Sequence, residues 1–196
     1  MADPASDAKP EIATLSSRVV YANRWMTVRE DAIQRQDGSH GIYGVVEKVD
    51  FVAIIPVEPD GSIHLVEQYR YPVGARFWEL PQGSWELSPQ ADPVSVARGE
   101  LREETGLHAE DMVKLGYLFE CYGYSNQGCH LFLARRLRYE GSDLDLEEQG
   151  LVCRRFTASE VVAMIESGRI RDATTVAAIG LMMMKGLFPQ GSGGTD

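Results

Sequence analysis

The chain has 196 residues and a formal net charge of -10 at pH 7, with 44% hydrophobic and 24% charged residues. This length and composition predict one soluble globular domain with a substantial core. The acidic balance argues against a nucleic-acid-binding surface, because such a surface requires clustered Lys and Arg. No apolar run approaches the length of a membrane span, and residues 1–7 lack the basic and apolar regions of a signal peptide. We therefore expect a cytoplasmic protein that binds neither nucleic acid nor membrane.

The cysteines and histidines do not suggest a metal site of their own. Cys121, Cys129 and Cys153 have no CxxC spacing, and an odd number cannot all pair within the chain. Buried, reduced thiols in a cytosolic protein are the expected state. The four histidines are scattered along the chain, which gives little support to a His-based metal site or catalytic triad.

Taken in chain order, the elements indicate a mixture of strands with a few helices. Residues 1–14 and 188–196 are predicted to be disordered tails around one domain at 15–187. Helices are expected between Asp92 and Gly106, from Thr157 to Gly168, and after Asp172. This arrangement predicts an α+β domain with a mixed sheet between helices. The segments that alternate enough to be strands are 18–28, 31–36, 42–47, 51–57, 62–69, 115–122, 130–134 and 151–156.

The most informative element is the first predicted helix, from Asp92 to Gly106. It begins with an N-cap followed by proline, and its glycine is placed to end it in the left-handed conformation. Glu100, Glu103 and Glu104 stand at i, i+3 and i+4, so all three are expected on one helix face. Adjacent carboxylates repel, and a bound hard divalent cation with oxygen ligands is the simplest explanation. The alternative is a solvated acidic face.

The flanking residues favour the metal-binding interpretation. Trp78–Gly83 is an apolar strand end running into a glycine turn, and a loop then leads to the helix. This unit of strand, glycine loop, helix and glycine stop resembles the Nudix box, the signature of the Nudix hydrolases, and residues 100–107 match its second half completely. The resemblance implies a Nudix fold: an α/β/α sandwich with a mixed β-sheet, here with an N-terminal antiparallel β extension.

Two departures from the Nudix box concern the segment before the acids. Gly99 stands where the family has an arginine, with Arg98 one place earlier, and the loop after Gly83 is two residues longer than the pattern. Glu86 and Asp92 are only approximate substitutes for the glutamate of that loop. In the family the arginine and this glutamate brace each other, so their joint loss resembles one compensated change.

The resemblance also implies the metal ligands. Glu100 and Glu104 would be direct ligands, joined by the backbone carbonyl of Gln82, and Glu103 would complete the cluster by bridging metals or orienting water. Mg²⁺ is the expected ion, with Mn²⁺ as a plausible substitute. For Glu103, the alternative role is that of a supporting acid outside the coordination sphere.

The likeness covers roughly residues 18–185 and extends to one branch of the family. Residues 51–73, Glu79–Pro81 and Gly168–Thr175 resemble the ADP-ribose and nucleoside-diphosphate-sugar pyrophosphatases. This implies a small-molecule nucleotide substrate, cleaved to a nucleoside monophosphate and a sugar phosphate. It also implies a homodimer whose N-terminal strands contribute to a shared site.

Candidate substrate contacts follow from the chemistry of a diphosphate linked to a nucleoside. Arg70 is a candidate clamp, because guanidinium binds phosphate bidentately; its alternative role is a surface salt bridge. Arg76 is a weaker candidate for a phosphate contact. Trp25 is a candidate to stack on the base, although an aromatic residue in a strand is more often part of the core.

The general base is the least determined residue. Gln127 lies where this branch often carries a catalytic glutamate, and its neutral amide can orient water but cannot accept a proton at pH 7. Glu148, in the acidic run 143–148, is the chosen candidate, and Glu103 is the second choice. Two alternatives therefore stay open: a Nudix-fold module that binds a nucleotide without cleaving it, and a hydrolase of dinucleoside polyphosphates or nucleoside triphosphates. Gly99 and Gln127 favour the module, and the three intact acids favour an enzyme.

Overall fold

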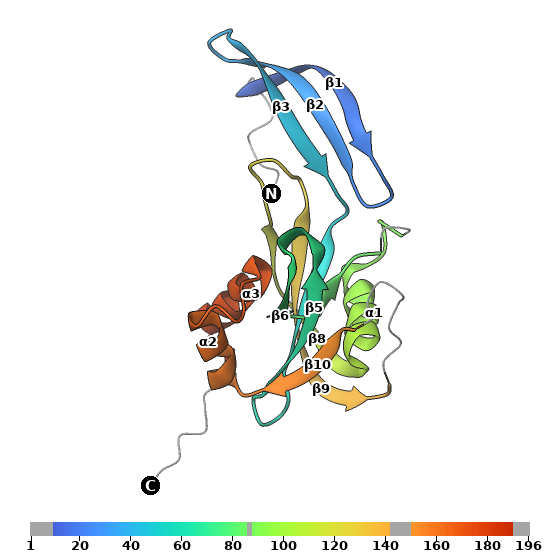
Figure 1. Ribbon diagram of the computed structural model, residues 1–196, viewed down its shortest axis with the longest axis vertical. Coiled ribbons are helices and arrows are strands. Elements are labelled where there is room, and N and C mark those ends of the chain that lie inside the picture. Colours follow the sequence, from blue (N-terminus) through green and yellow to red (C-terminus); the bar gives the residue numbers. More distant parts are fainter. Residues whose placement is uncertain (1–9, 86–87, 142–149, 190–196) are drawn as a thin grey trace, which may run out of the picture. The chain divides into compact units, whose positions relative to one another are not determined.

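The computed structural model describes residues 10–85, 88–141 and 150–189. The chain forms two compact units, one up to Val49 together with 121–127, and the other comprising 50–120 and 128–196 (Figure 1). The boundary after Val49 falls inside the segment 15–187 that the sequence presented as one domain.

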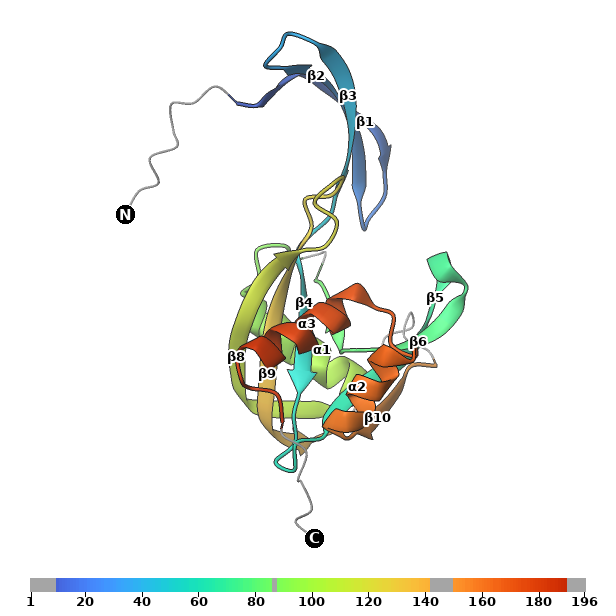
Figure 2. The same cartoon turned by 90° about the vertical axis from the view of Figure 1, so that its left-hand side faces the viewer.

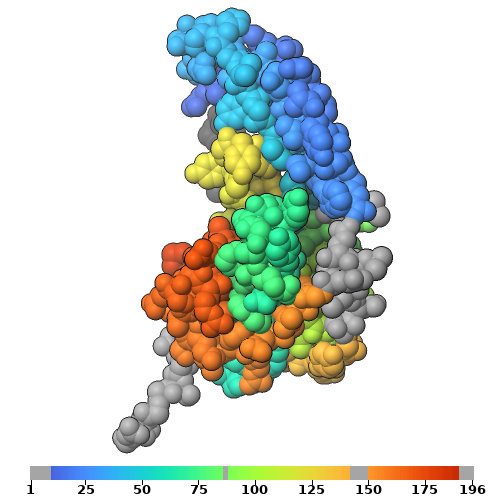
Figure 3. Space-filling model, viewed as in Figure 1, coloured from blue at the N-terminus to red at the C-terminus, as the bar shows by residue number. Residues whose placement is uncertain are grey.

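The first unit is built on a three-stranded antiparallel sheet in the order β1-β2-β3, which confirms the predicted N-terminal β extension. Its strands are β1 (Ile12–Ala22), β2 (Thr27–Arg35) and β3 (His40–Glu47). In Figure 3 these strands are coloured blue, and on the face shown no other described residues of the unit cover them. Within the described residues of this unit, only Asp31 and Ile33 are buried.

Two sequence predictions for this unit need correction. The strand predicted over 18–28 is wrong in its middle, because residues 23–26 form the turn between β1 and β2. The side chain of Asn23 accepts hydrogen bonds from the backbone N–H groups of Trp25 and Met26, each at 2.9 Å, and such Asn bonds stabilise turns. In addition, β1 begins at Ile12, inside the segment predicted to be a disordered tail.

Among the described residues, the second unit holds two sheets and the three α-helices. One sheet is mixed, in the order β7-β4-β9-β8, with β4 and β9 parallel; the other is antiparallel, in the order β10-β5-β6. Figure 2 shows α2 and α3 beside these strands, and a short 3-10 turn covers Tyr71–Val73. The elements are β4 (Phe51–Pro56), β5 (Ile63–Arg70), β6 (Ala75–Glu79), β7 (Gln82–Gly83), α1 (Pro93–Thr105), β8 (Leu107–Phe119), β9 (Gly128–Tyr139), β10 (Val152–Phe156), α2 (Ala158–Glu166) and α3 (Ala173–Met184).

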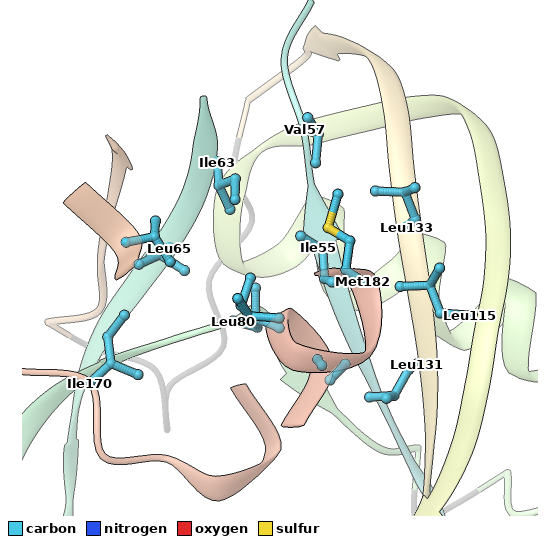
Figure 4. Close-up of a cluster of buried hydrophobic side chains, with 14 of the residues drawn as sticks. Ile55, Val57, Ile63, Leu65, Leu80, Leu115, Leu131, Leu133, Ile170 and Met182 are labelled. Carbon is cyan, nitrogen blue, oxygen red and sulfur yellow. The ribbon is translucent and has the colours of Figure 1, made fainter. Parts of the chain in front are cut away.

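The core of this unit shows a sandwich of helix, sheet and helix. Alternate residues of β4 enter two separate apolar clusters, as the two-residue period of a strand requires. Val52 and Ile54 belong to the cluster that contains Leu101 of α1. Ala53 and Ile55 belong to the cluster that contains residues of α2 and α3, including Met182 (Figure 4). The predicted α+β fold, with an α/β/α sandwich around a mixed sheet, is therefore confirmed.

The strand after α1 is longer than the sequence indicated. β8 begins at Leu107, directly after Gly106, whereas the prediction placed its start at Leu115. The residue Leu107 already pairs with Tyr139 of β9, so the chain enters the sheet as soon as the helix ends. In the part of the chain that the structure describes, no helix combines the length and apolar character needed to span a membrane.

Candidate active site

Helix α1 has the boundaries that its capping residues predict. The side chain of Asp92 accepts a hydrogen bond from the backbone N–H of Ser95 at 3.2 Å, which satisfies a donor at the helix start. Gly106 has φ of 72°, and its N–H donates to the carbonyl of Arg102 at 2.8 Å. These two ends hold the three acids of α1 in the last turns of a regular helix.

The three acids do not share one environment. Glu100 and Glu104, one turn apart, are only 5% and 3% exposed. Glu103 is partly exposed, with its carboxylate 3.8 Å from the guanidinium of Arg102. The helix therefore turns two carboxylates inward and leaves the third at the rim.

The inward carboxylates lie against the loop strand β7. The backbone N–H of Gln82 donates to Oε2 of Glu104 at 2.9 Å. At Gly83, an added Cβ would lie 2.3 Å from Oε2 of Glu100, closer than any side chain can approach. Glycine at this position thus allows the backbone to contact a buried carboxylate. The sequence predicted that the backbone carbonyl of Gln82 joins the acids as a metal ligand. In the structure, the backbone N–H of the same residue donates to Glu104.

The donor set fits a hard divalent cation. Within the described ranges, no three His, Cys, Asp or Glu side chains gather into a ready-made cage for a metal ion. Mg²⁺ does not need one, since it is usually bound by one or two carboxylates and keeps several waters or phosphate oxygens. Glu100 and Glu104, two buried carboxylates on successive turns beside a polar backbone segment, match that requirement.

Arg70, the predicted diphosphate clamp, is paired with a buried acid. Its Nε donates to Oε2 of Glu79 at 3.1 Å, and its terminal nitrogen contacts the other carboxylate oxygen. Gln68 donates to the same carboxylate at 2.8 Å. Burial acts to lower the pKa of Arg70, but the hydrogen bond and charge of Glu79 outweigh it and the pKa is raised. Burial raises the pKa of Glu79, against the opposing effect of Arg70.

The start of α3 holds Leu80, which lies just before β7. The hydroxyl of Thr175, which is fully buried, donates to the N-cap carboxylate of Asp172 at 2.6 Å and accepts from the N–H of Leu80 at 2.9 Å. Thr174 donates to Glu120 at 2.9 Å, and burial raises the pKa of Glu120. Asp172 was predicted as the cap of this helix, but the sequence assigned no role to Thr174 or Thr175, although the match at 168–175 includes both. Thr175 fixes Leu80, three residues before Gly83.

The remaining predicted site residues are placed in separate surroundings. Arg76 donates to the side chain and backbone of Glu67, at 3.2 and 2.9 Å, and to the carbonyl of Gly150. Trp25 and Gln127 belong to the first unit: Trp25 lies in the β1–β2 turn, and Gln127 donates to the carbonyl of Val49 at 2.8 Å. The structure thus brings together Glu100, Glu104 and Gln82, with Glu103 at the rim. Glu148 and Glu86 lie outside the described residues.

Glu104 also lines a cavity of about 350 Å³ in the second unit. The walls come from α1, the ends of β8 and β9, and strands β5 and β10, and they include His64, Cys153 and Arg154. Burial raises the pKa of the Cys153 thiol from 9.0 to about 11. Since a protonated thiol is a weak nucleophile, Cys153 serves as an uncharged wall residue near neutral pH.

Comparison with known proteins assigns both parts of the chain. A model described as the NUDIX domain matches residues 47–178, and one described as the nucleoside diphosphate sugar hydrolase N-terminal domain matches 12–46. The chain is 30% identical to an ADP-ribose pyrophosphatase of Mycobacterium tuberculosis, over 88% of this chain and 83% of that protein. It is 28% identical to a methanol dehydrogenase activator of Bacillus methanolicus, over 89% of this chain and 94% of that protein. In fold it matches the crystal structure of an ADP compounds hydrolase with a TM-score of 0.79 and 21% identity, over 93% of this chain and 100% of that one.

Proposed function

Since this chain belongs to the Nudix family, we propose that it is a metal-dependent pyrophosphohydrolase acting on a nucleoside diphosphate linked to a sugar, such as ADP-ribose. The observation that carries the proposal is the pair of buried carboxylates, Glu100 and Glu104, held against the backbone of β7. The match of residues 12–46 to the N-terminal domain of nucleoside diphosphate sugar hydrolases supports the substrate class.

A divalent cation is part of this function, and we propose Mg²⁺, with Mn²⁺ as a substitute. Glu100 and Glu104, with the backbone of Gln82, are the residues that would hold it. When bound, the cation neutralises phosphate oxygens and lowers the pKa of a coordinated water. The contribution of the chain is to keep two carboxylates buried side by side before substrate arrives, which avoids a reorganisation during the reaction.

The reaction adds one water to the diphosphate. The oxygen of the water forms a bond to one phosphorus, the bridging P–O bond breaks, and the products are a nucleoside monophosphate and a sugar phosphate. The water loses a proton, which a carboxylate must accept. Glu148 is the proposed acceptor, and Glu103, at the rim of the two buried acids, is the second candidate.

Four further residues are proposed to contact the substrate or the attacking water. Arg70 is the proposed phosphate contact, because its side chain is 41% exposed and Glu79 fixes its orientation. Trp25 is proposed to stack on the base and Gln127 to orient water. Arg76 is the weakest of these proposals, because its guanidinium already contacts Glu67 and Gly150. We further propose that the protein is a homodimer, which the exposed apolar side chains of the first unit support. We propose the cytoplasm as its compartment.

The second candidate function is a nucleotide-binding regulatory module, which the likeness to a methanol dehydrogenase activator favours. A single assay separates the candidates. The protein is incubated with Mg²⁺ and, in turn, ADP-ribose, ADP-glucose, GDP-mannose, a diadenosine polyphosphate and a nucleoside triphosphate, and the products are resolved by ion-exchange chromatography. Release of a nucleoside monophosphate from the first three supports the proposal. Tight binding of one compound with no turnover of any would favour the regulatory module, and turnover confined to the last two would change the substrate class.

A further inference from the structure

Gly99 lies in the interior of α1, directly before the buried acid Glu100. Glycine at such a position disfavours the helix relative to alanine, so it calls for a reason. The reason is steric: a Cβ at residue 99 would lie 2.4 Å from Cζ2 of Trp85 and 3.2 Å from its Cε2. The indole ring therefore occupies the space in which any other residue would place its side chain.

Trp85 comes from the loop that follows β7. Besides Gly99, its ring packs against the apolar cluster around α1, to which Val94, Met112 and Leu137 also contribute. It stands two residues after Gly83, whose backbone contacts Glu100. The loop thus meets α1 at two neighbouring points, Gly83 on Glu100 and Trp85 on Gly99, and in both a glycine removes the Cβ that would keep the surfaces apart.

We propose that Trp85, seated on Gly99, is a positioning residue that holds the β7 segment against the two buried carboxylates. It acts through Gln82 and Gly83, whose backbone contacts Glu104 and Glu100, and it takes the place of the arginine–glutamate brace expected from the Nudix box. This position matters because the binding of a cation by the carboxylates and the adjacent backbone depends on the distance between them. The role in cation binding rests on the proposed function; the steric pairing of Trp85 with Gly99 does not.

The chain offers a matched control for this pairing. Gly180 also lies inside a helix, α3, and a Cβ added there would meet no atom within 4 Å. Helix propensity alone predicts that Gly99→Ala and Gly180→Ala each stabilise the protein, by about 2–4 °C in Tm for a chain of this size. The proposal predicts opposite signs: Gly180→Ala raises Tm, and Gly99→Ala lowers it because the methyl group displaces the indole.

Double substitution tests whether Trp85 is the cause. In the Trp85→Ala background the clash is absent, so Gly99→Ala should then raise Tm as Gly180→Ala does. Trp85→Phe keeps a ring in the same place, so its Tm should be closer to that of the wild type than the Tm of Trp85→Ala. If Gly99→Ala raises Tm in the wild-type background, the indole does not occupy this space and the proposal is overturned.

The positioning role has two readouts of its own. The first is hydrogen exchange at the amide of Gln82, which donates to Glu104; it should be about tenfold faster in Gly99→Ala and Trp85→Ala, and unchanged in Gly180→Ala. The second is the dissociation constant of Mn²⁺ measured by titration calorimetry, expected to rise about 10-fold in the same two variants. Unchanged exchange at Gln82 would overturn the positioning role. A wild-type protein that binds Mn²⁺ but cleaves no nucleotide would overturn the proposed function instead.

Discussion

Both units of this chain are built on hydrogen-bonded sheets, yet they differ in how far they bury their apolar side chains. In the second unit, β4 and β9 are covered on both faces, and side chains such as Phe132 and Leu131 are completely buried. In the first unit, β1–β3 leave large apolar side chains open to solvent, among them Val19 at 64% and Ile42 at 71% exposure. A sheet of this size gains little stability from backbone pairing alone and needs a surface to pack on. One unit therefore carries a core and the paired acids, and the other presents an exposed apolar surface.

The largest effect on turnover is expected at the buried acids of the second unit. Glu104→Gln removes the charge of a buried carboxylate while keeping its size, so turnover of ADP-ribose should fall by at least about 100-fold, the upper range seen for residues that only support a ligand. The fold should persist, because the amide oxygen can still accept from the N–H of Gln82. Steady-state kinetics and circular dichroism measure the two effects.

Glu30→Gln in β2 is the control from the other unit. Glu30 forms an exposed ion pair with Arg18 at 2.8 Å, and such pairs contribute about 0–1 kcal/mol. Its loss should leave turnover unchanged. Near-wild-type turnover in Glu104→Gln would show that the buried acids are not the reactive centre, and the division of roles between the units would fail.

The next effect concerns packing. Leu131 of β9 is fully buried, so Leu131→Ala should lower the free energy of unfolding by about 2–5 kcal/mol. Val19→Ala in β1 should change it by no more than about 0.5 kcal/mol, since the side chain is exposed in a single chain. Urea denaturation followed by circular dichroism gives both values.

The Val19 result also tests the proposed homodimer. A large loss of stability for Val19→Ala that disappears at low protein concentration would mean that this face is covered in solution by a second copy. Analytical ultracentrifugation of the same variant then reports whether the assembly has dissociated. A small loss with an unchanged sedimentation coefficient would leave the first unit as an open surface.

Sequence reasoning reached the fold because its signals are local. The cap at Asp92, the stop at Gly106 and the spacing of the three acids are all read within one helix, and each is present in the structure. The unequal burial of Glu100 and Glu103 could not be read in this way, because it depends on β7 packing against one side of α1. The bond from Leu80 to Thr175 joins residues 95 positions apart, and only the folded chain reveals it. Local patterns thus predict elements, whereas the tertiary partners of those elements decide which of their side chains form the site.

A smaller effect is expected if the first unit contributes to substrate binding. Trp25 is 44% exposed, with the guanidinium of Arg24 4.1 Å from its ring centre. An aromatic contact contributes about 0.5–1.5 kcal/mol beyond its buried area, so Trp25→Ala should raise KM for ADP-ribose by about 2- to 10-fold with little change in kcat. Ile42→Ala, at an exposed position in β3 of the same unit, serves as the control. A fall in kcat without a change in KM would mean that Trp25 acts in the chemical step, so that the first unit would take part in catalysis as well.

The smallest effect concerns the ionisation of the cysteine thiols, which are buried to different extents in the two units. Burial raises the pKa of Cys153 to about 11 and also raises that of Cys129, both in the second unit, whereas Cys121 in the first unit is exposed. Because the unfolded thiols ionise near pH 9 and the folded ones do not, the unfolded state binds fewer protons above that pH, and stability should fall as pH rises from 9 to 11. Urea denaturation at pH 8, 9, 10 and 11 measures this slope, which should be reduced in Cys153→Ala and unchanged in Cys121→Ala. An equal slope in all three proteins would mean that Cys153 ionises as readily in the folded chain as in the unfolded one, and that the cavity beside Glu104 is open to water.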